Sequence, residues 1–318
     1  MTKIALAIHG GAGTILRSQM TPALEAEYRK GLEAAMDAGW KVLCRKGSAL
    51  DAVEAAVCSL EDFPLFNAGR GAVFTHEGKQ EMDAAIMDGS ALKAGAVAAV
   101  KNIRNPISLA RLVMDRTPHV LLAGEGAGQF AEELGVSTEP DEYFFTEHRW
   151  RQLQDALADG RIRLDHSAPK AMGTVGAVAC DGSGRLAAAT STGGMTNKKF
   201  GRVGDTPLVG LGTYADDICA VSCTGHGEYF MLSVAAHDVA ARMRYKGLSL
   251  NDAAEETVAR LTEIGGEGGL IAVDQYGNVT LPFNSEGMYR GFITEGGSPQ
   301  IGIYSEQAAS SQRPNKAT

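Results

Sequence analysis

Residues 174–192 read TVGAVACDGSGRLAAATST and contain the clearest structural signal in the chain. Two runs of small and β-branched residues flank the turn sequence DGSG, which predicts a β-hairpin that begins at Thr174. The preceding residues 160–173, GRIRLDHSAPKAMG, carry mixed charge, a proline and no hydrophobic period, so they are predicted to form an exposed connector. A threonine therefore opens a strand directly behind Gly173.

The composition is that of an ordinary globular protein. Of the 318 residues, 44% are hydrophobic and 21% are charged, and no uncharged apolar run approaches the roughly 18 residues of a membrane span. The net charge of -8 and the lack of a Lys/Arg cluster argue against nucleic acid as a partner. The first apolar stretch is too short for a secretory signal, so a cytoplasmic location is predicted. Five cysteines, an odd number within apolar patterns, are expected to be buried free thiols.

Hydrophobic periodicity predicts helices and strands in both halves of the chain. Helices are expected at 21–47, 48–60, 105–118, 125–134, 147–158, 227–245 and 250–263, with Thr21, Ser48 and Ser249 as caps. Besides the hairpin, strands are expected at 3–8, 81–100 (two strands joined by a turn at 88–90), 208–214 and 219–224, with a last hairpin around 276–278. This order favours one layered domain in which two sheets are faced by helices.

Thr174 is the candidate nucleophile. If the bond after Gly173 is cut, Thr174 carries both a hydroxyl and an α-amine, so a nucleophile and a base share one residue. An α-amine has a pKa of about 7.7, so roughly 40% of it is neutral at about pH 7.5, against about 0.1% for an ordinary lysine. Gly173 suits such a cut because glycine adopts strained backbone angles. The alternative is that threonine stands here only because it packs well in strands.

A glycine-rich loop at 191–205, STGGMTNKKFGRVGD, carries Arg202 and Asp205. A guanidinium binds an α-carboxylate and a carboxylate binds an α-ammonium, so the pair predicts recognition of an amino-acid head group. Alternatively, the two side chains pair with each other at the surface. Thr224 and Gly225 end an apolar strand just before a helix, where backbone N–H groups suit an oxyanion hole, or where Thr224 serves as a helix N-cap.

Two further glycine-rich sequences, HGGAG at 9–13 and GEGAG at 124–128, match a dinucleotide loop only in part. Residue 129 is Gln, and the first sequence continues into RSQMTP before any helix begins. Cofactor binding is therefore not expected. His9 is expected to serve the turn after the first strand, and the other histidines are expected in surface or capping roles.

The motifs together carry a family resemblance over nearly the whole chain. In the order seen in plant-type asparaginases, also called isoaspartyl peptidases, the chain contains HGGAG, NAGRGAVFT, MDG, GEGA, MGTVGAVACD, AATSTGGMTNK, GRVGDTPLVGLGTYAD and SCTGHGE. These enzymes are N-terminal nucleophile hydrolases. The resemblance implies an α+β fold, a four-layer αββα sandwich, made as a precursor that cuts itself before the nucleophilic threonine. It also implies subunits of residues 1–173 and 174–318, assembled as a dimer of α–β heterodimers.

Carried over motif by motif, the resemblance makes Thr174 the nucleophile, with the Thr192 hydroxyl helping to activate it and Asn67 beside it. The other matched positions are Arg202 and Asp205, which would hold the substrate's α-carboxylate and α-ammonium groups, and Thr224 and Gly225, which would line the oxyanion hole. His226 departs from the small hydroxyl residue common in relatives, and it is close enough to Thr224 to alter the mouth of the pocket.

In bacterial relatives, the loop around FNAG holds a sodium ion through backbone carbonyls. The resemblance therefore implies a structural sodium ion here, bound by the carbonyls of Leu60, Glu61, Phe63, Phe66, Ala68 and Arg70. Arg70 is itself a departure, because an apolar residue is expected beside a cation. No cofactor is expected to be required for catalysis.

The implied activity is hydrolysis of β-aspartyl (isoaspartyl) dipeptides and L-asparagine, with release of L-aspartate. Two alternatives remain. One is a glycosylasparaginase-like hydrolase on the same scaffold, and the other is an amino-acid-binding protein that never matures. In each case, the expected partners are small molecules, with no nucleic acid and no membrane.

Overall fold

The computed structural model describes residues 3–158 and 173–305, so the predicted connector lies outside the described residues except for Gly173. The strands are β1 (Ala5–Gly13), β2 (Met82–Asp88), β3 (Lys93–Val100), β4 (Leu121–Ala123), β5 (Val175–Cys180), β6 (Leu186–Thr192), β7 (Thr213–Ala215), β8 (Cys219–Gly225), β9 (Gly268–Asp274), β10 (Val279–Thr280), β11 (Gly287–Thr294) and β12 (Gln300–Tyr304). They form an eight-stranded sheet, in the order β12-β11-β1-β5-β6-β2-β3-β4, and a four-stranded sheet, in the order β10-β9-β8-β7.

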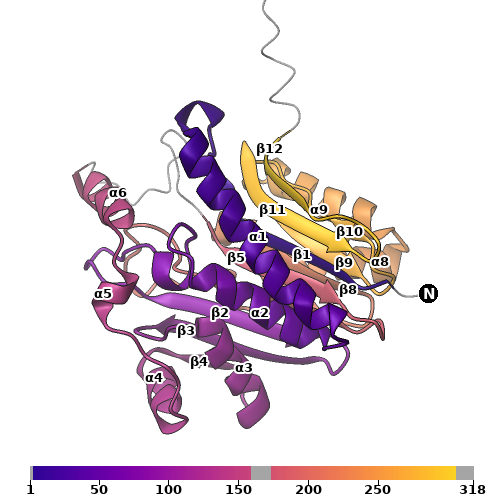
Figure 1. Cartoon of the computed structure of the whole chain (residues 1–318), viewed down its shortest axis with the longest axis horizontal. Helices are drawn as coiled ribbons and strands as arrows, with labels where there is room; N and C mark the ends of the chain where they lie inside the picture. Colours follow the sequence, from indigo (N-terminus) through magenta and orange to yellow (C-terminus); the bar gives the residue numbers. More distant parts are fainter. Residues whose placement is uncertain (1–2, 159–172, 306–318) are drawn as a thin grey trace, which may run out of the picture.

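The helices lie outside the two sheets (Figure 1). They are α1 (Pro22–Cys44), α2 (Ala49–Glu61), α3 (Pro106–Arg116), α4 (Gly124–Glu133), α5 (Asp141–Phe144), α6 (Glu147–Ala158), α7 (Gly227–Ser233), α8 (Ala235–Lys246) and α9 (Leu250–Glu263), with short 3-10 turns at Arg17–Gln19 and Gly69–Gly71. Helices α1, α2 and α3 pack against the larger sheet, and α8 and α9 pack against the smaller one. The mixed α+β class is therefore confirmed.

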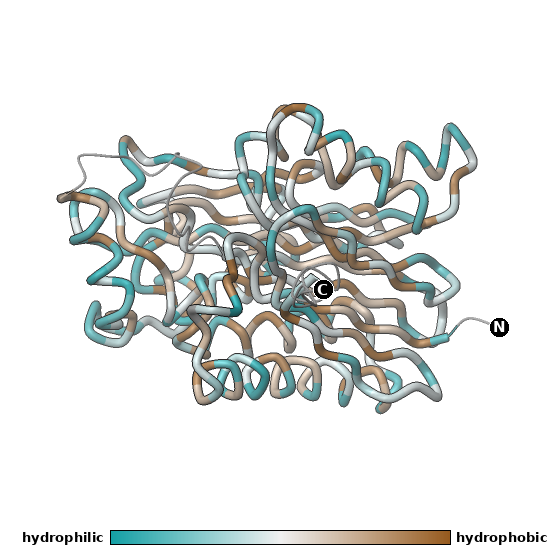
Figure 2. The backbone as a smooth tube through the Cα atoms, turned by 90° about the horizontal axis from the view of Figure 1, so that it is seen from above, coloured by the Kyte–Doolittle hydropathy of each residue, from teal (hydrophilic) through white to brown (hydrophobic). Residues whose placement is uncertain are grey.

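Alternation of side chains along the strands gives each sheet two apolar faces. In β1, Leu6 and Ile8 pack in the core under α1 and α2. Ala5 and Ala7 point the other way and meet β8 and β9 of the smaller sheet in a second core, which lies between the two sheets. A third core lies between the smaller sheet and α8 and α9. Figure 2 shows hydrophilic stretches alternating with hydrophobic ones along the outer helices, as expected where only one side of a helix is buried.

The sequence predicted the starts of three helices correctly. The hydroxyls of Thr21, Ser48 and Ser249 each accept a hydrogen bond from the backbone N–H three residues further on, at 3.2, 3.1 and 3.2 Å. Such a bond satisfies one of the N–H groups that a helix start leaves without a partner. The β5–β6 hairpin is confirmed as well, with antiparallel pairing from Val175 opposite Ser191 to Cys180 opposite Leu186.

Three predicted boundaries were wrong. The first strand does not end at residue 8 but continues through HGGAG to Gly13, because β11 pairs along it and glycine at positions 11 and 13 adopts positive φ. The strand predicted at 208–214 is reduced to Thr213–Ala215, preceded by turns. The helix predicted at 227–245 is two helices, because Val234 between them has left-handed backbone angles (φ 52°).

Two paired strands near the carboxyl end, β11 and β12, were not predicted at all. In β11, the sequence GMYRGFIT mixes glycine and arginine with apolar residues and shows no clean alternation. Its place between β1 and β12 comes from long-range pairing that a local pattern does not reveal. No helix in the described part of the chain is long and apolar enough to span a membrane.

Candidate active site

The β5–β6 hairpin brings two of the predicted site residues together. Thr174 directly precedes β5, and Thr192 ends β6 on the neighbouring antiparallel strand. Strand β8 of the smaller sheet packs against both strands and ends with Thr224 and Gly225. The topology thus places three threonines, from three different strands, at one end of the space between the sheets.

Hydrogen bonds connect these three threonines. Thr174 Oγ1 donates to Thr192 Oγ1 over 3.1 Å. The Thr174 backbone N–H donates to Thr224 Oγ1 over 3.4 Å. Thr192 Oγ1 also accepts from the Gly194 N–H over 3.0 Å. Because Thr174 donates its hydroxyl proton, electron density on its oxygen increases, as a nucleophile requires.

Asn67 fixes the loop that follows Thr192. Its Nδ2 donates to the Gly194 carbonyl over 2.7 Å, and its Oδ1 accepts from the Val73 N–H over 3.0 Å. The side chain is buried, and a Cβ added to Gly173 would lie 3.6 Å from the Asn67 Cβ. Asn67 therefore lies beside the bond that precedes Thr174.

Gly225 lines the same cavity as Thr192, and Thr224, which precedes it, contacts the backbone of Thr174. Thr224 Oγ1 accepts from the Ala12 N–H over 3.1 Å in addition to the bond from Thr174. Gly225 has a φ of 145°, which only glycine adopts readily. The residue that caps α7 is His226, and its side chain makes no capping bond. The interpretation of Thr224 as a helix N-cap is therefore wrong.

Arg202 is held by a residue that the sequence did not single out. Its Nε and Nη2 donate to the two carboxylate oxygens of Glu228, each over 3.0 Å. His226 Nε2 lies 3.5 Å from the same carboxylate. Burial alone would raise the pKa of Glu228, but hydrogen bonds and charge from Arg202 lower it. Since Glu228 takes the Nε–Nη2 edge, the guanidinium keeps its Nη1–Nη2 edge for another carboxylate.

Asp205 is buried a short distance from this pair. Burial raises the pKa of its carboxyl to about 6, partly offset by the positive charge of Arg202. Because the hydrogen-bonded partner of Arg202 is Glu228 and Asp205 is buried, the alternative of a surface pair between Arg202 and Asp205 is wrong. A buried carboxylate without a closely bonded cation is suited to an incoming ammonium group.

Most of the predicted residues line one small cavity. Its lining consists of Gly173, Thr174, Thr192, Gly194, Met195, Arg202, Gly204, Asp205, Thr206, Gly225 and Gly227. The nucleophile candidate and both candidate head-group ligands therefore face the same space.

His9 lies within β1 and not in a turn, so the predicted turn role was wrong. The imidazole is fully buried, with Nδ1 2.8 Å from the Thr174 carbonyl oxygen and Nε2 2.8 Å from Ser222 Oγ. Burial lowers the pKa of His9 to about 3, and the hydrogen bond to the Thr174 carbonyl raises it by a smaller amount. The ring is therefore neutral at physiological pH.

The loop implied to hold sodium follows α2. The backbone carbonyls of Phe63, Phe66 and Ala68 each accept a backbone N–H after the helix, and the Leu60 carbonyl accepts from both Asp62 and Phe63. A carbonyl oxygen has two lone pairs, so the first three can each take a further partner. The Arg70 guanidinium lies over the Tyr143 ring, 5.3 Å from its centroid. Such neutral oxygen donors fit an alkali cation, and Arg70 would take part through its main chain only.

The buried carboxyl of Glu61 lies between this loop and the candidate site. It accepts from Ser191 Oγ over 2.6 Å and from the Ile107 N–H over 3.0 Å. Burial raises its pKa to about 8, with these hydrogen bonds acting in the opposite direction. Glu61 thus ties the end of α2 to the residue next to Thr192.

Comparison with known proteins agrees with this geometry. The family model described as asparaginase matches residues 2–303. The chain belongs to the asparaginase family. It is 56% identical to an isoaspartyl peptidase from Salmonella typhimurium, over 96% of this chain and all of the relative. It is 54% identical to an isoaspartyl peptidase from Escherichia coli (96% and 98% covered) and 45% identical to a plant-type L-asparaginase from Pyrococcus abyssi (94% and 100%).

The thiols of this asparaginase-family chain form no metal site in the part that is described. All five cysteines are free, and no group of three or more His, Cys, Asp or Glu side chains there is placed to hold a metal ion. Cys219 and Cys223 lie in the core on β8, as the strand pattern predicted. Cys44 is exposed at the end of α1 and Cys58 is only half-buried on α2, so the expectation of five buried thiols was wrong for these two residues.

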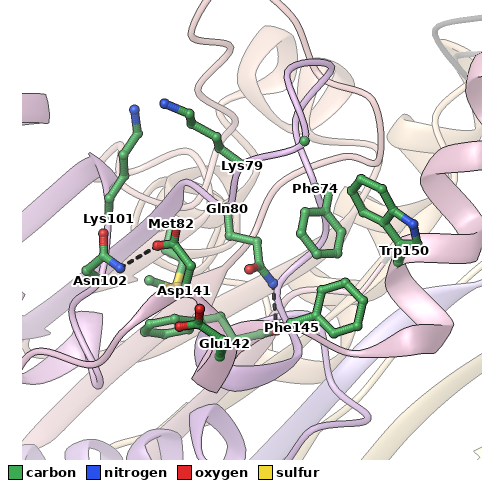
Figure 3. Close-up of a pocket in the computed structure, with 12 residues that line it drawn as sticks. Phe74, Lys79, Gln80, Met82, Lys101, Asn102, Asp141, Glu142, Phe145 and Trp150 are labelled. Carbon is green, nitrogen blue, oxygen red and sulfur yellow. Dashed lines mark hydrogen bonds between the residues drawn. The ribbon is translucent and has the colours of Figure 1, made fainter.

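A larger cavity, of about 420 Å³, lies away from the threonines (Figure 3). Phe74, Phe145 and Trp150 form an aromatic wall on one side, with the Phe74 and Trp150 ring centroids 5.3 Å apart. Asn102 Nδ2 donates to Asp141 over 2.7 Å on the other side. Among the described residues, the lining of this cavity includes no serine, threonine or cysteine side chain.

Proposed function

We propose that this asparaginase-family protein hydrolyses isoaspartyl dipeptides and L-asparagine after cutting itself between Gly173 and Thr174. The observation that carries the proposal is the convergence of Thr174, Thr192, Arg202 and Asp205 on one cavity. The relatives at 54–56% identity are named isoaspartyl peptidases and the relative from Pyrococcus abyssi is named a plant-type L-asparaginase, which supports both substrates.

Maturation is an internal acyl transfer. The Thr174 Oγ1 attacks the Gly173 carbonyl carbon, the peptide C–N bond breaks, and the nitrogen takes up the proton to become the α-amine of Thr174. Water then hydrolyses the resulting ester and restores the hydroxyl. The close approach of β1 supports an ordered scissile bond, since a Cβ added to Gly11 would lie 2.5 Å from the Gly173 Cα.

Catalysis repeats this chemistry on substrate. The free α-amine of Thr174 accepts the hydroxyl proton, and Oγ1 attacks the side-chain carbonyl of the aspartyl group. The Arg202 guanidinium binds the substrate α-carboxylate and Asp205 binds its α-ammonium. The oxyanion is stabilised by Thr224 and Gly225. The leaving ammonia or amino acid takes the proton from the α-amine, and water releases L-aspartate from the acyl-enzyme.

The proposed function also implies a particular layered fold and subunit arrangement. The order helices, larger sheet, smaller sheet, helices supports an αββα sandwich of the N-terminal nucleophile type, with subunits 1–173 and 174–318. The exposed side chains of Phe200 and Leu232 support a dimer of such heterodimers, because subunit contacts cover apolar surface. The carbonyls of the loop after α2 would hold a structural sodium ion, with no part in the reaction.

A denaturing gel with amino-terminal sequencing tests the proposal. Purified protein is expected to give two bands of about 18 and 15 kDa, in proportion to 173 and 145 residues, and the smaller is expected to begin TVGAVA. Thr174→Ala is expected to remain a single inactive chain. A single band from the unaltered protein, together with amino-acid binding but no turnover, would instead indicate a binding protein that does not mature.

A further inference from the structure

A second row of polar side chains lies directly beneath the candidate site. Because side chains alternate along a strand, Thr190 points the same way as Thr192 in β6, and Ser222 points the same way as Thr224 in β8. Thr190 Oγ1 and Ser222 Oγ lie 2.7 Å apart, and Thr213 Oγ1 donates to Thr190 Oγ1 over 2.6 Å. All three of these lower hydroxyls are buried, and the proposed reaction uses none of them.

His9 connects the two rows. Its Nδ1 lies 2.8 Å from the Thr174 carbonyl oxygen and its Nε2 lies 2.8 Å from Ser222 Oγ. A carbonyl oxygen only accepts hydrogen bonds, so Nδ1 carries the proton and Nε2 accepts from the Ser222 hydroxyl. The Ser222 hydroxyl then accepts from Thr190 and donates to His9, and His9 donates to Thr174. The Thr213 hydroxyl lies within hydrogen-bond distance of both Thr190 Oγ1 and the Thr206 carbonyl, over 2.6 and 3.1 Å.

The backbone is shaped to admit this imidazole. A Cβ added to Gly176 would overlap both His9 Nε2 and Ser222 Oγ, so the space that a side chain would take is already filled. The pairing of β1 with β5 ends at His9 opposite Gly176, and the register of β1 with β11 shifts just after His9. Thr174 therefore lies beyond the paired part of β5, and a side chain supplies the donor for its carbonyl.

We propose that His9 is a positioning residue for the Thr174 nucleophile. Once the chain is cut, Thr174 has no preceding peptide, so its only covalent link to the protein runs through its own carbonyl. The bond from His9 Nδ1 fixes that carbonyl and thereby the directions of the amine and hydroxyl toward Thr192 and Thr224. This inference rests on the proposed function, because it requires Thr174 to be the nucleophile.

Three replacements of His9 separate the bond to Thr174 from the bulk of the ring. His9→Phe keeps the bulk and removes both nitrogens. In His9→Asn, the side-chain amide nitrogen is separated from Cα by the same number of bonds as Nδ1 of histidine. It can therefore donate to the Thr174 carbonyl. In His9→Gln, the same amide reaches the position of Nε2 instead, which makes Gln the matched control.

The measurement is steady-state hydrolysis of L-asparagine, with kcat expressed per free Thr174 amino terminus, as counted by amino-terminal sequencing. We expect His9→Phe and His9→Gln to lower kcat about tenfold to hundredfold with KM within about twofold, and His9→Asn to recover kcat to within about threefold of the unaltered protein. The inference is overturned if His9→Phe keeps its kcat or if Asn restores no more than Gln.

Ser222→Ala keeps the test decisive if the His9 variants fail to fold. Without the Ser222 hydroxyl, the imidazole is no longer held in the tautomer that donates to Thr174, so kcat is expected to fall about threefold to tenfold at constant KM. Thr257→Val is the control, because it removes a buried hydroxyl on α9 that lies 2.9 Å from both the Ala253 carbonyl and the Asp238 carboxylate, away from the candidate site. The inference fails if Ser222→Ala matches this control in kcat.

The Thr174→Ala variant separates the positioning role of His9 from the nucleophilic role of Thr174. If it is inactive while His9→Phe keeps normal kcat, only the positioning role is wrong. If Thr174→Ala itself stays active, the proposed function is refuted, and the role of His9 is refuted with it.

Discussion

Gly176→Ala is the substitution for which the structure gives the sharpest expectation. The new methyl group would overlap His9 Nε2 and Ser222 Oγ and would lie 3.0 Å from the Ala189 carbonyl oxygen. Forcing a methyl into a packed interior costs about 1–3 kcal/mol. Displacing His9 leaves buried polar atoms without partners, which costs about 1–3 kcal/mol more. We therefore expect the free energy of unfolding to fall by about 2–6 kcal/mol.

Urea unfolding followed by circular dichroism measures this loss. All variants are compared in the Thr174→Ala background, so that each remains one covalent chain. Gly182→Ala is the matched control, because its methyl would meet only the Ile4 side chain, at 3.8 Å, and its expected effect is within about 0.5 kcal/mol. If Gly176→Ala unfolds at the same urea concentration as Gly182→Ala, the packing argument around His9 is refuted.

Three further predictions concern the site and the core. Because burial raises the pKa of Asp205 to about 6, kcat/KM for L-asparagine is expected to fall again as the pH is lowered through about 6, below the fall that protonation of the Thr174 α-amine causes near about 7.7, and Asp205→Asn should remove only the step near 6. Glu228→Gln is expected to raise KM about fivefold with kcat within about twofold, since Glu228 orients the Arg202 guanidinium; an unchanged KM would contradict that role. Phe66→Ala is expected to lower the free energy of unfolding by about 3–5 kcal/mol in urea titration, because its ring is buried against Tyr28.

Local patterns predicted the elements that are formed by contacts near in sequence. The caps at Thr21, Ser48 and Ser249 and the β5–β6 hairpin depend on residues within a few positions of each other, and all were predicted correctly. Strand β11 depends on pairing with β1, nearly the whole chain away, and was missed. The break at Val234 was missed because the apolar period runs through it, while the backbone turns left-handed there.

In the candidate site, too, local patterns were predicted and contacts between distant residues were missed. Arg202 and Asp205 stand three residues apart in a glycine-rich loop, so their chemistry was visible in the sequence. Glu228 was missed because its pairing with Arg202 spans 26 residues and depends on how α7 packs. A signal for Ser222 was present, since a hydroxyl two residues before Thr224 faces the same side of the strand, but only the structure shows that His9 meets it.

The order of strands in the larger sheet bears on how the two products of the proposed self-cleavage would stay associated. Strand β1, from the first 173 residues, lies between β11 and β5, which both come from the remainder. Strand β2, also from the first part, pairs on one side with β6 from the remainder. Cutting one peptide bond would therefore leave two interlocked polypeptides that can part only by unfolding. Dilution or gel filtration would not divide them, and the mature enzyme would melt cooperatively, as an unbroken chain does.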